Sequence, residues 1–341
     1  MELTILKGLV VLLCLVIPLA IYFWPSRPLK IKEIWVYPIK SMKGIQLNEC
    51  EIDDNGFKYD RIYMVAEPDH KANDGSYRFI TQREEPRLIL IRTAIDLDKK
   101  SIILEYPPEN ATVEIPLEIE QSILDSLPSV PSFIWNQTPL SYDIGAGLPE
   151  IKKFLCIVFA DKPERASQMT MVAPQKRRTV ERNAPTSGVL NRIPTSSFQD
   201  YYPGNLITTS SLNSLYGKVF ERTKGEVQIC QQNFRPNLVI ESEKPWDEDT
   251  WKSVMIADKY VWHVACRNVR CQVTTVNLKR GQFEKSHEPY KTMQTFRRVD
   301  PGAPFHPCFG MNLVHGQVGY KLKVGDQLVV TSRGEHIYEV I

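Results

Sequence analysis

The chain has 341 residues, of which 43% are hydrophobic and 24% are charged, and its net charge is +2. This is the composition of an ordinary globular protein, and the length is sufficient for two domains. So small a net charge excludes a nucleic-acid binder that works by bulk electrostatics, and any cationic site must be local. The seven cysteines are an odd number scattered along the chain, which excludes a dense disulfide framework and indicates a reducing compartment.

The N-terminal segment, residues 1–30, is predicted to be a membrane anchor. Residues 8–24 carry no charge and end in three aromatic side chains, which is just sufficient for a transmembrane helix with an interfacial aromatic belt. Bulky residues and Pro25 follow where a signal peptide would have small residues for cleavage. Because arginine and lysine residues come after the run, the positive-inside rule places the rest of the protein in the cytosol.

Residues 31–160 are expected to form a first β-barrel domain. Apolar runs separated by turn signals recur here, as they do in the short strands of a barrel or sandwich. An amphipathic helix is predicted at about residues 147–154, and a buried strand at residues 156–160. The clearest of the other predicted strands are residues 34–39, 62–66, 87–92 and 101–106.

Residues 161–341 are expected to form a second β-rich domain, which begins with a basic segment at residues 162–203. Apolar periodicity is lost in this segment, which reads either as a solvated linker or as a basic loop over an anionic ligand. A helix capped by Ser210 or Ser211 is predicted next. Strands are then expected at residues 238–240, 260–262 and 273–276, with a closing hairpin from residue 328 onward. The predicted fold class is mainly β with a few helices, in two β-barrel domains behind one transmembrane helix.

Cys271 is the first candidate for a chemically active group. It stands in the stretch Cys266-Arg267-Asn-Val-Arg270-Cys271, at the start of a predicted β-branched strand. Nearby cations favour the thiolate, the form of cysteine that acts as nucleophile and metal ligand, and soft thiolates favour soft or redox-active metals. The alternative is a buried, inert thiol beside two solvated arginines. A zinc site would need a second close pair of cysteines, which the sequence lacks.

Three further regions complete a set of residues that suits an anionic metal cofactor with a phosphate group. Together with Cys271 they offer a thiolate, several cations and short polar donors. Each region is a weak signal alone, and the ordered set is specific. The regions are Lys40-Ser41-Met-Lys-Gly, Tyr-Asp-Arg61 with a later Thr-Gln-Arg83, and Asn-Phe-Arg235-Pro-Asn237.

The ordered set resembles the MOSC family, named after the C-terminal domain of molybdenum cofactor sulfurase, together with its N-terminal β-barrel companion. Within this family the chain looks most like the mitochondrial amidoxime-reducing components. The resemblance covers nearly the whole chain after the anchor. It implies a molybdenum cofactor (molybdopterin) whose metal is bound by Cys271. The other cofactor contacts that it implies are Lys40, Ser41, Arg61, Arg235, Asn237 and Arg270.

The resemblance also implies a function, the reduction of N-hydroxylated compounds such as amidoximes and hydroxylamines. Electrons would come from NADH through cytochrome b5 reductase and cytochrome b5, on the cytosolic face of the mitochondrial outer membrane. Two alternatives stay open, a molybdenum-cofactor or sulfur carrier with a persulfide on Cys271, and a tethered scaffold with an inactive site. The chain departs from the family pattern at Cys266, where the family often has a Cys-x-x-Cys spacing. It also departs at Tyr201 and Tyr202, where the family tends to have small hydroxyl residues.

Overall fold

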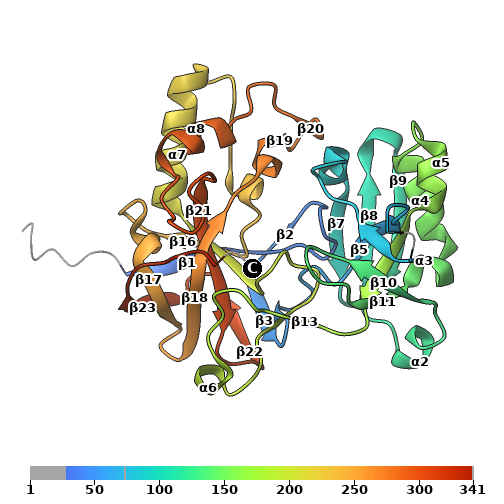
Figure 1. Ribbon diagram of the computed structural model, residues 1–341, viewed down its shortest axis with the longest axis horizontal. Coiled ribbons are helices and arrows are strands. Elements are labelled where there is room, and N and C mark those ends of the chain that lie inside the picture. Colours follow the sequence, from blue (N-terminus) through green and yellow to red (C-terminus); the bar gives the residue numbers. More distant parts are fainter. Residues whose placement is uncertain (1–27, 73, 340–341) are drawn as a thin grey trace, which may run out of the picture.

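The computed structural model describes residues 28–72 and 74–339 of the chain. It is mainly β with short helices, as predicted, and Figure 1 shows two bodies side by side. The larger body is built on an eight-stranded sheet and the smaller one on a closed five-stranded barrel. Nearly all of the predicted anchor lies outside the described residues. Among the described residues, no helix has the length and apolar character needed to cross a membrane.

The large sheet combines the first strands of the chain with its C-terminal half. Strand β1 pairs with β2, β23 and β16, and the pairing with β16 closes the sheet on itself. The first strands therefore lie in the sheet of the C-terminal half, although they were predicted to belong to the N-terminal barrel. In sheet order the strands are β16 (Leu238–Glu241), β15 (Gly204–Thr208), β21 (Cys308–His315), β18 (Tyr260–Val269), β17 (Trp251–Ile256), β23 (Gln327–Arg333), β1 (Leu29–Val36) and β2 (Ile45–Leu47).

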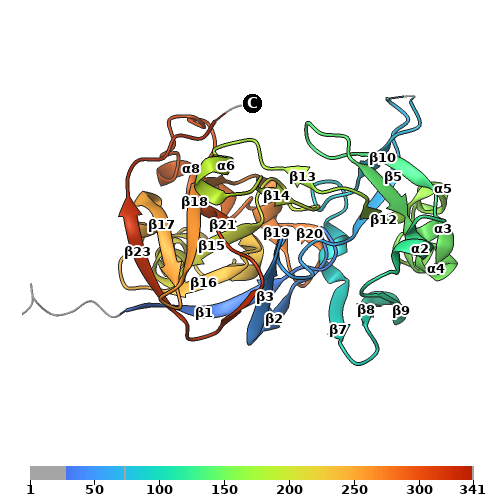
Figure 2. The same cartoon turned by 90° about the horizontal axis from the view of Figure 1, so that it is seen from below.

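The small barrel also crosses the predicted domain boundary at residue 160. Its strand β12 comes from the segment that was predicted to be a basic loop, and it pairs with β11 and β5. The barrel strands are β10 (Ser129–Phe133), β11 (Leu140–Asp143), β12 (Thr170–Pro174), β5 (Met64–Pro68) and β6 (Tyr77–Phe79). A three-stranded sheet lies beside this barrel, at the lower edge of the smaller body in Figure 2, and consists of β7 (Arg92–Asp96), β8 (Ser101–Tyr106) and β9 (Ala111–Pro116).

Smaller strands and helices complete the two bodies. The remaining strands are β3 (Glu49–Asp53), β4 (Gly56–Phe57) and β22 (Tyr320–Lys323) in one sheet, β13 (Arg178–Thr179) with β14 (Thr195–Ser196), and β19 (Val276–Asn277) with β20 (Gln282–Phe283). The α-helices are α2 (Gln121–Leu124), α3 (Ile144–Gly147), α4 (Pro149–Val158), α5 (Pro163–Gln168), α6 (Ser187–Leu190), α7 (Thr209–Thr223) and α8 (Tyr290–Phe296). The 3-10 helices are η1 (Pro86–Leu90), η2 (Pro107–Glu109), η3 (Gln231–Phe234), η4 (Asp247–Thr250) and η5 (Gln272–Thr275).

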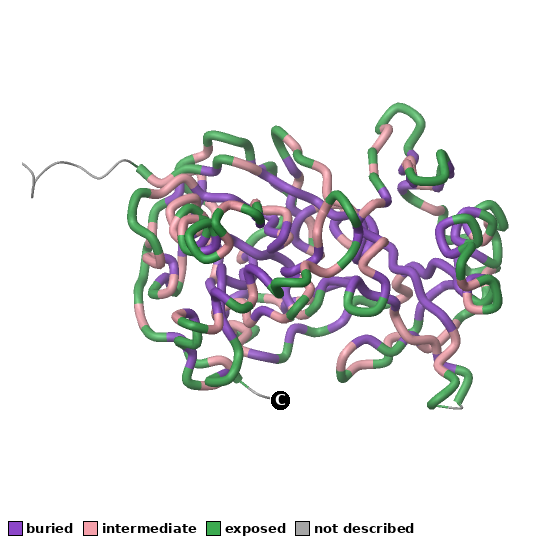
Figure 3. The backbone as a smooth tube through the Cα atoms, turned by 90° about the horizontal axis from the view of Figure 1, so that it is seen from above, coloured by how far each residue is buried: buried purple, intermediate pink, exposed green. Residues whose placement is uncertain are grey.

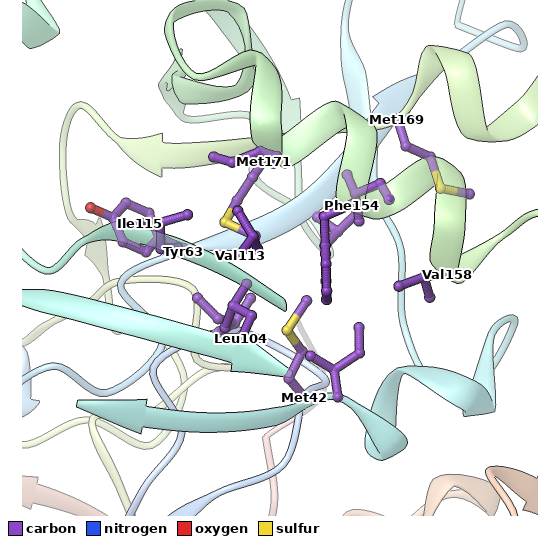
Figure 4. Close-up of a cluster of buried hydrophobic side chains, with 14 of the residues drawn as sticks. Met42, Tyr63, Leu104, Val113, Ile115, Phe154, Val158, Met169 and Met171 are labelled. Carbon is purple, nitrogen blue, oxygen red and sulfur yellow. The ribbon is translucent and has the colours of Figure 1, made fainter. Parts of the chain in front are cut away.

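Each body has its own hydrophobic core. In the smaller body, α4 packs Phe154 and Val158 against strands of the barrel and of the neighbouring three-stranded sheet, as Figure 4 shows. Met42, which follows β1, is buried in this same core and so ties the start of the chain to the smaller body. Figure 3 shows buried segments running from one body into the other. The two bodies therefore meet through buried chain rather than through an exposed linker.

The local pattern predicted some elements correctly and misassigned others. The strand at residues 101–106 is β8, and the helix predicted near residue 150 is α4. That helix continues through residues 156–158, which were predicted to be a strand, because Ile151, Phe154, Leu155 and Val158 all face the core at helical spacing. The helix predicted after Ser210 or Ser211 is α7, but it is capped by the side chain of Thr208.

Two other predicted strands are absent from the described residues at the expected places, and the predicted closing hairpin is incomplete. Residues 86–90 form η1, with Pro86 in its first turn, instead of the strand expected at residues 87–92. Residues 272–275 form η5, because the hydroxyls of Thr274 and Thr275 donate to carbonyls three residues earlier. Cys271 therefore precedes a turn rather than a strand. The closing hairpin is a single strand, β23, which pairs with β17 and β1.

His315 makes the stability of the fold sensitive to acid. It is fully buried on β21, and burial together with Arg192 lowers its pKa from 6.5 to about 3. Below pH 6.5 the unfolded chain binds a proton that the folded chain does not, so the stability falls as the pH drops from 6.5 toward 3. This proton uptake lowers the free energy of unfolding by up to about 1.4 kcal/mol for each pH unit, and we expect His315→Phe to remove that dependence. Urea unfolding at pH 7 and pH 5 measures this loss. His306→Phe, at an exposed position, is the control, and an equal pH slope in both variants would contradict the assignment.

Candidate functional site

One cavity, of about 340 Å³, brings together all seven residues that the sequence analysis selected. It is lined by residues of both bodies. The seven are Lys40, Ser41, Arg61, Arg235, Asn237, Arg270 and Cys271. Residues that the sequence analysis did not select as site residues also line it, above all Arg83, Trp135 and Asp200.

Two arginines of the cavity wall contact the buried ring of Tyr37, which directly follows β1. The guanidinium of Arg61 lies 4.2 Å from the ring centroid and that of Arg235 lies at 4.3 Å. Both arginines have a left-handed backbone, with φ of 52° and 50°. Such a conformation is uncommon for a residue other than glycine and persists only where the surroundings enforce it. Arg61 donates Nη1 to both carboxylate oxygens of the buried Asp60, at 2.6 Å each.

Arg235 carries a donor without an acceptor. Its Nη1 donates to the carbonyl of Met42 at 2.6 Å, but its buried Nη2 has no hydrogen-bond partner within the described chain. Burial and the neighbouring Arg61 lower the pKa of Arg235 to about 10, so it is charged at neutral pH. A buried unpaired donor on a cation is costly, and an anion in the cavity would satisfy it.

Lys40 and Asp200 form an ion pair at the cavity wall. The Lys40 ammonium is buried and donates to Asp200 Oδ1 at 2.5 Å and to the carbonyl of Phe198 at 2.9 Å. Burial lowers the pKa of Lys40 to about 8, although Asp200 opposes this shift. Desolvation would raise the pKa of Asp200, but Lys40 and Arg83 outweigh it and hold that pKa well below the usual carboxyl range. Asp200 therefore remains ionised, and Lys40 is the group that gives up a proton near neutral pH.

The arginine that contacts the Cys271 sulfur comes from a segment 188 residues earlier in the sequence. Arg83 donates Nη2 to Cys271 Sγ at 3.3 Å. The sequence neighbours Arg267 and Arg270, which were expected to supply this charge, bind elsewhere. Arg267 pairs with Asp300 at 3.0 Å. Cys271 itself is partly exposed, so its sulfur is open to a ligand.

Asn237 and Arg270 are held by the protein itself. The Asn237 side chain accepts from the backbone of Asn205 and donates to the carbonyl of Trp35, which links β15 and β1 beside the cavity. Arg270 donates to the carbonyls of Phe309 and Phe234, at 2.8 and 2.9 Å. Burial lowers the pKa of Arg270 to about 10. Both residues shape the cavity wall, and their hydrogen-bonding groups are largely engaged there.

The cations of the predicted basic segment do not line the cavity. Arg178 is buried and donates Nε to the carbonyl of Ser197 at 2.9 Å, and Arg192 donates to that of His315 at 2.7 Å. The bonds of Arg178 hold the chain that carries Asp200 and Tyr201, and that of Arg192 ties the segment to β21. The segment is therefore neither a solvated linker nor a loop whose charges face a ligand directly.

The balance of charge in the cavity favours an anionic ligand. Five of the described lining side chains are cations, namely Lys40, Arg61, Arg83, Arg235 and Arg270, whereas Asp200 is the one carboxylate among them. Cations in a partly desolvated cavity bind phosphate strongly, and arginine does so through two parallel hydrogen bonds. A sulfur ligand and a phosphate-binding wall thus lie in the same cavity. Within the described residues, no cluster of three or more His, Cys, Asp or Glu side chains could hold a metal ion by itself.

Comparison with known families matches two parts of the chain. Residues 29–143 match the MOSC N-terminal beta barrel domain, and residues 195–329 match the MOSC domain. The chain belongs to the MOSC-domain family. The seven selected residues fall within these two matches, so the cavity lies where the two MOSC-family regions meet.

Curated relatives of this MOSC protein carry two kinds of name. This MOSC protein is 29% identical to "Mitochondrial amidoxime reducing component 2" of Rattus norvegicus, over 87% of this chain and 81% of the relative. It is 28% identical to the protein of that name from Homo sapiens, over 89% and 85% of the two chains. It is also 27% identical to "Molybdenum cofactor sulfurase" of Oryza sativa subsp. japonica, over 79% of this chain but 31% of that protein. Among solved structures, the YUAD protein from Bacillus subtilis matches with a TM-score of 0.30 at 8% identity, which is too low to inform the fold.

Cys266 of the MOSC domain is a buried structural thiol. It lies 3.2 Å from the hydroxyl of Tyr202 and accepts from Asn312 Nδ2 at 3.4 Å. Burial raises the pKa of Cys266 to about 11. Tyr202 in turn donates to the carbonyl of Arg182 at 3.0 Å. Its ring, at a position where the chain departs from the family pattern, is therefore fixed beside the cavity.

We expect Cys266→Ala to cost about 1–3 kcal/mol of unfolding free energy, because it removes the acceptor of the buried Asn312 Nδ2 and one of the two hydrogen bonds of the Tyr202 hydroxyl. Thermal and urea unfolding measure this cost. Native alkylation followed by mass spectrometry should label the partly exposed Cys271 and spare Cys266. Rapid labelling of Cys266 in the folded protein would contradict the structural role.

Proposed function

We propose that this MOSC protein is a molybdenum-cofactor-dependent reductase of N-hydroxylated compounds such as amidoximes and hydroxylamines. One observation carries the proposal, a partly exposed cysteine sulfur in a cavity whose wall holds the unpaired Nη2 of Arg235. The printed names of the relatives, which refer to amidoxime reduction and to molybdenum cofactor, support the same chemistry.

The residues present fit the cofactor. Cys271 would bind the metal through its sulfur, the soft ligand that such metals prefer. Arg235 and Arg61 would hold the phosphate, since they stand together at the ring of Tyr37 and Arg235 carries the donor without an acceptor. When bound, the cofactor supplies the redox centre that delivers electrons to the N–O bond.

The remaining groups of the cavity can serve the proton balance of the reaction. Reduction of an N-hydroxyl compound consumes two electrons and two protons, breaks the N–O bond, and releases the N–H product and water. Lys40, with a pKa of about 8, is a source of protons at the wall. The ionised Asp200, whose Oδ1 lies 2.5 Å from Lys40 Nζ, orients that ammonium and balances its positive charge.

The source of the electrons and the cellular location of the protein complete the proposal. The sequence lacks a Gly-x-Gly-x-x-Gly dinucleotide motif, which favours a route in which the electrons of NADH come through other proteins. We infer cytochrome b5 reductase and cytochrome b5 as these proteins. The segment of residues 1–30 would hold the chain on the mitochondrial outer membrane. The names of the mitochondrial relatives and the apolar sequence of this segment support this location.

A carrier of molybdenum cofactor or of sulfur is the second candidate, because one set of relatives is named molybdenum cofactor sulfurase. Cys271 would then carry a persulfide, and the cavity would hold the cofactor without turnover. Molybdenum content and catalysis separate these two functions.

The deciding experiment uses the full chain, made in a host that supplies the cofactor. Molybdenum per protein is measured first, and the reduction of benzamidoxime with a chemical electron donor is measured second. Near-stoichiometric molybdenum with turnover supports the reductase. Molybdenum or pterin without turnover supports the carrier. Protein with neither of them, and with no persulfide on Cys271, overturns both functions and leaves a tethered scaffold.

A further inference from the structure

Arg83 contacts the Cys271 sulfur from an exposed position. It follows β6 in the smaller body, and its side chain is exposed, whereas Cys271 lies in the larger body. An unrestrained arginine loses about 1.5–2 kcal/mol of side-chain entropy when it is fixed in one geometry. A contact that holds the guanidinium must offset this loss, or the hydrogen bond to the sulfur would be occupied for only part of the time.

Such a contact is provided by a chain of contacting aromatic rings and guanidinium groups, the aromatic–arginine stack. The Arg83 guanidinium lies 4.6 Å from the ring centroid of Trp135. Trp135 is stacked on Tyr201, with centroids 5.6 Å apart and an interplanar angle of 24°. Arg182 lies between Tyr201 and Tyr338, at 4.7 and 4.6 Å from their ring centroids. Arg182 also donates to the Tyr338 hydroxyl.

Trp135 is the member that joins the two bodies. It stands in the tight turn after β10, where Ile134 and Gln137 form a bridge, and its φ is 59°. A left-handed backbone costs a residue other than glycine roughly 1 kcal/mol or more, so its surroundings must hold it there. Tyr201 and Phe79, whose ring centroids lie 5.6 and 5.5 Å from that of Trp135, are those surroundings.

We propose that Trp135 is a positioning residue, which holds Arg83 on the Cys271 sulfur and thereby sets the reduction potential of the metal bound there. A donor to a ligating sulfur withdraws charge and stabilises the reduced metal, so it raises the potential. This inference rests on the proposed function. Tyr201, one of the departures from the family pattern, takes part because its ring stacks on Trp135, which in turn contacts the Arg83 guanidinium.

The test compares midpoint potentials of the molybdenum-loaded full chain in a potentiometric titration followed by EPR. We expect Arg83→Gln to lower the potential and Trp135→Leu to lower it by most of the same amount. Trp135→Phe, which keeps an aromatic face, should recover most of the shift. Trp246→Leu is the matched control, because Trp246 also has a left-handed backbone (φ 66°) and also carries an arginine, Arg297, at 4.2 Å, away from Cys271.

The double variant decides how Trp135 acts. If Trp135 acts through Arg83, Trp135→Leu adds no further shift when Arg83 is already glutamine. Additive shifts, or a loaded Trp135→Leu protein with the potential of the parent chain, would overturn the inference alone. Parent protein that contains no molybdenum would overturn the proposed function, and this inference with it.

Discussion

Replacement of Cys271 by alanine is expected to lower benzamidoxime reduction by more than about 100-fold in a protein that stays folded. Loss of a group that only supports a metal ligand typically costs 10–100-fold, and the loss of the proposed ligand itself should cost more. The fold should survive, because the side chain is partly exposed and, among the described residues, hydrogen-bonds only to the exposed Arg83. Turnover with a chemical donor and circular dichroism measure the two effects.

Cys156→Ala is the matched control for this variant, since Cys156 is an exposed thiol on the outer face of α4. It should leave both turnover and molybdenum content unchanged. Pterin should remain bound in Cys271→Ala, because the phosphate-binding side chains are intact. Turnover at the parent rate in Cys271→Ala would remove Cys271 as the metal ligand.

Arg235→Ala is expected to weaken cofactor binding by about 10- to 150-fold. A hydrogen bond from a charged donor is worth about 1.5–3 kcal/mol, and the unpaired Nη2 of Arg235 is the donor placed to make one. Arg235→Lys should give an intermediate affinity, because an ammonium keeps the charge but lacks the planar fork of donors. Pterin and molybdenum per protein, followed over time after gel filtration, report the rate of cofactor loss.

The control for Arg235→Ala is Arg92→Ala. Arg92 is an exposed arginine of β7, paired with Glu105 at 3.6 Å and absent from the cavity lining. Surface pairs of this kind contribute about 0–1 kcal/mol. Cofactor retention should match the parent protein in Arg92→Ala. Equal retention in Arg235→Ala would mean that the phosphate binds elsewhere in the cavity.

The predictability of the fold follows the range of the interactions that form each element. Helices α4 and α7 were predictable because their buried residues recur at helical spacing within the sequence itself. The pairing of β1 with β16 and β23 was not, since these partners lie about 200 and 300 residues further along the chain. The two apolar runs that became η1 and the end of α4 show the same limit, because a short apolar run fits a strand, a turn or a buried helix equally well.

The composition of the site was predictable to a similar degree. The order of Lys40, Arg61, Arg235 and Cys271 along the sequence was sufficient to select residues that line a single cavity. Trp135 and Asp200 gave no sequence signal, because one is a lone tryptophan in a turn and the other an acid at the end of a basic segment. Arg83 stood in a segment that the sequence analysis had noted, but nothing in that segment indicated a contact with a cysteine 188 residues away.

The sequence by itself determined the chemical inventory of this protein, a thiol with a set of cations in the order typical of the MOSC family. Tertiary structure alone decided which cation acts on which group. Arg270, adjacent to Cys271, donates to the buried carbonyls of Phe234 and Phe309, and the distant Arg83 reaches the sulfur. The physical reason is that a side chain goes where its hydrogen bonds are best satisfied, and the long-range packing of the two bodies sets the positions of those partners.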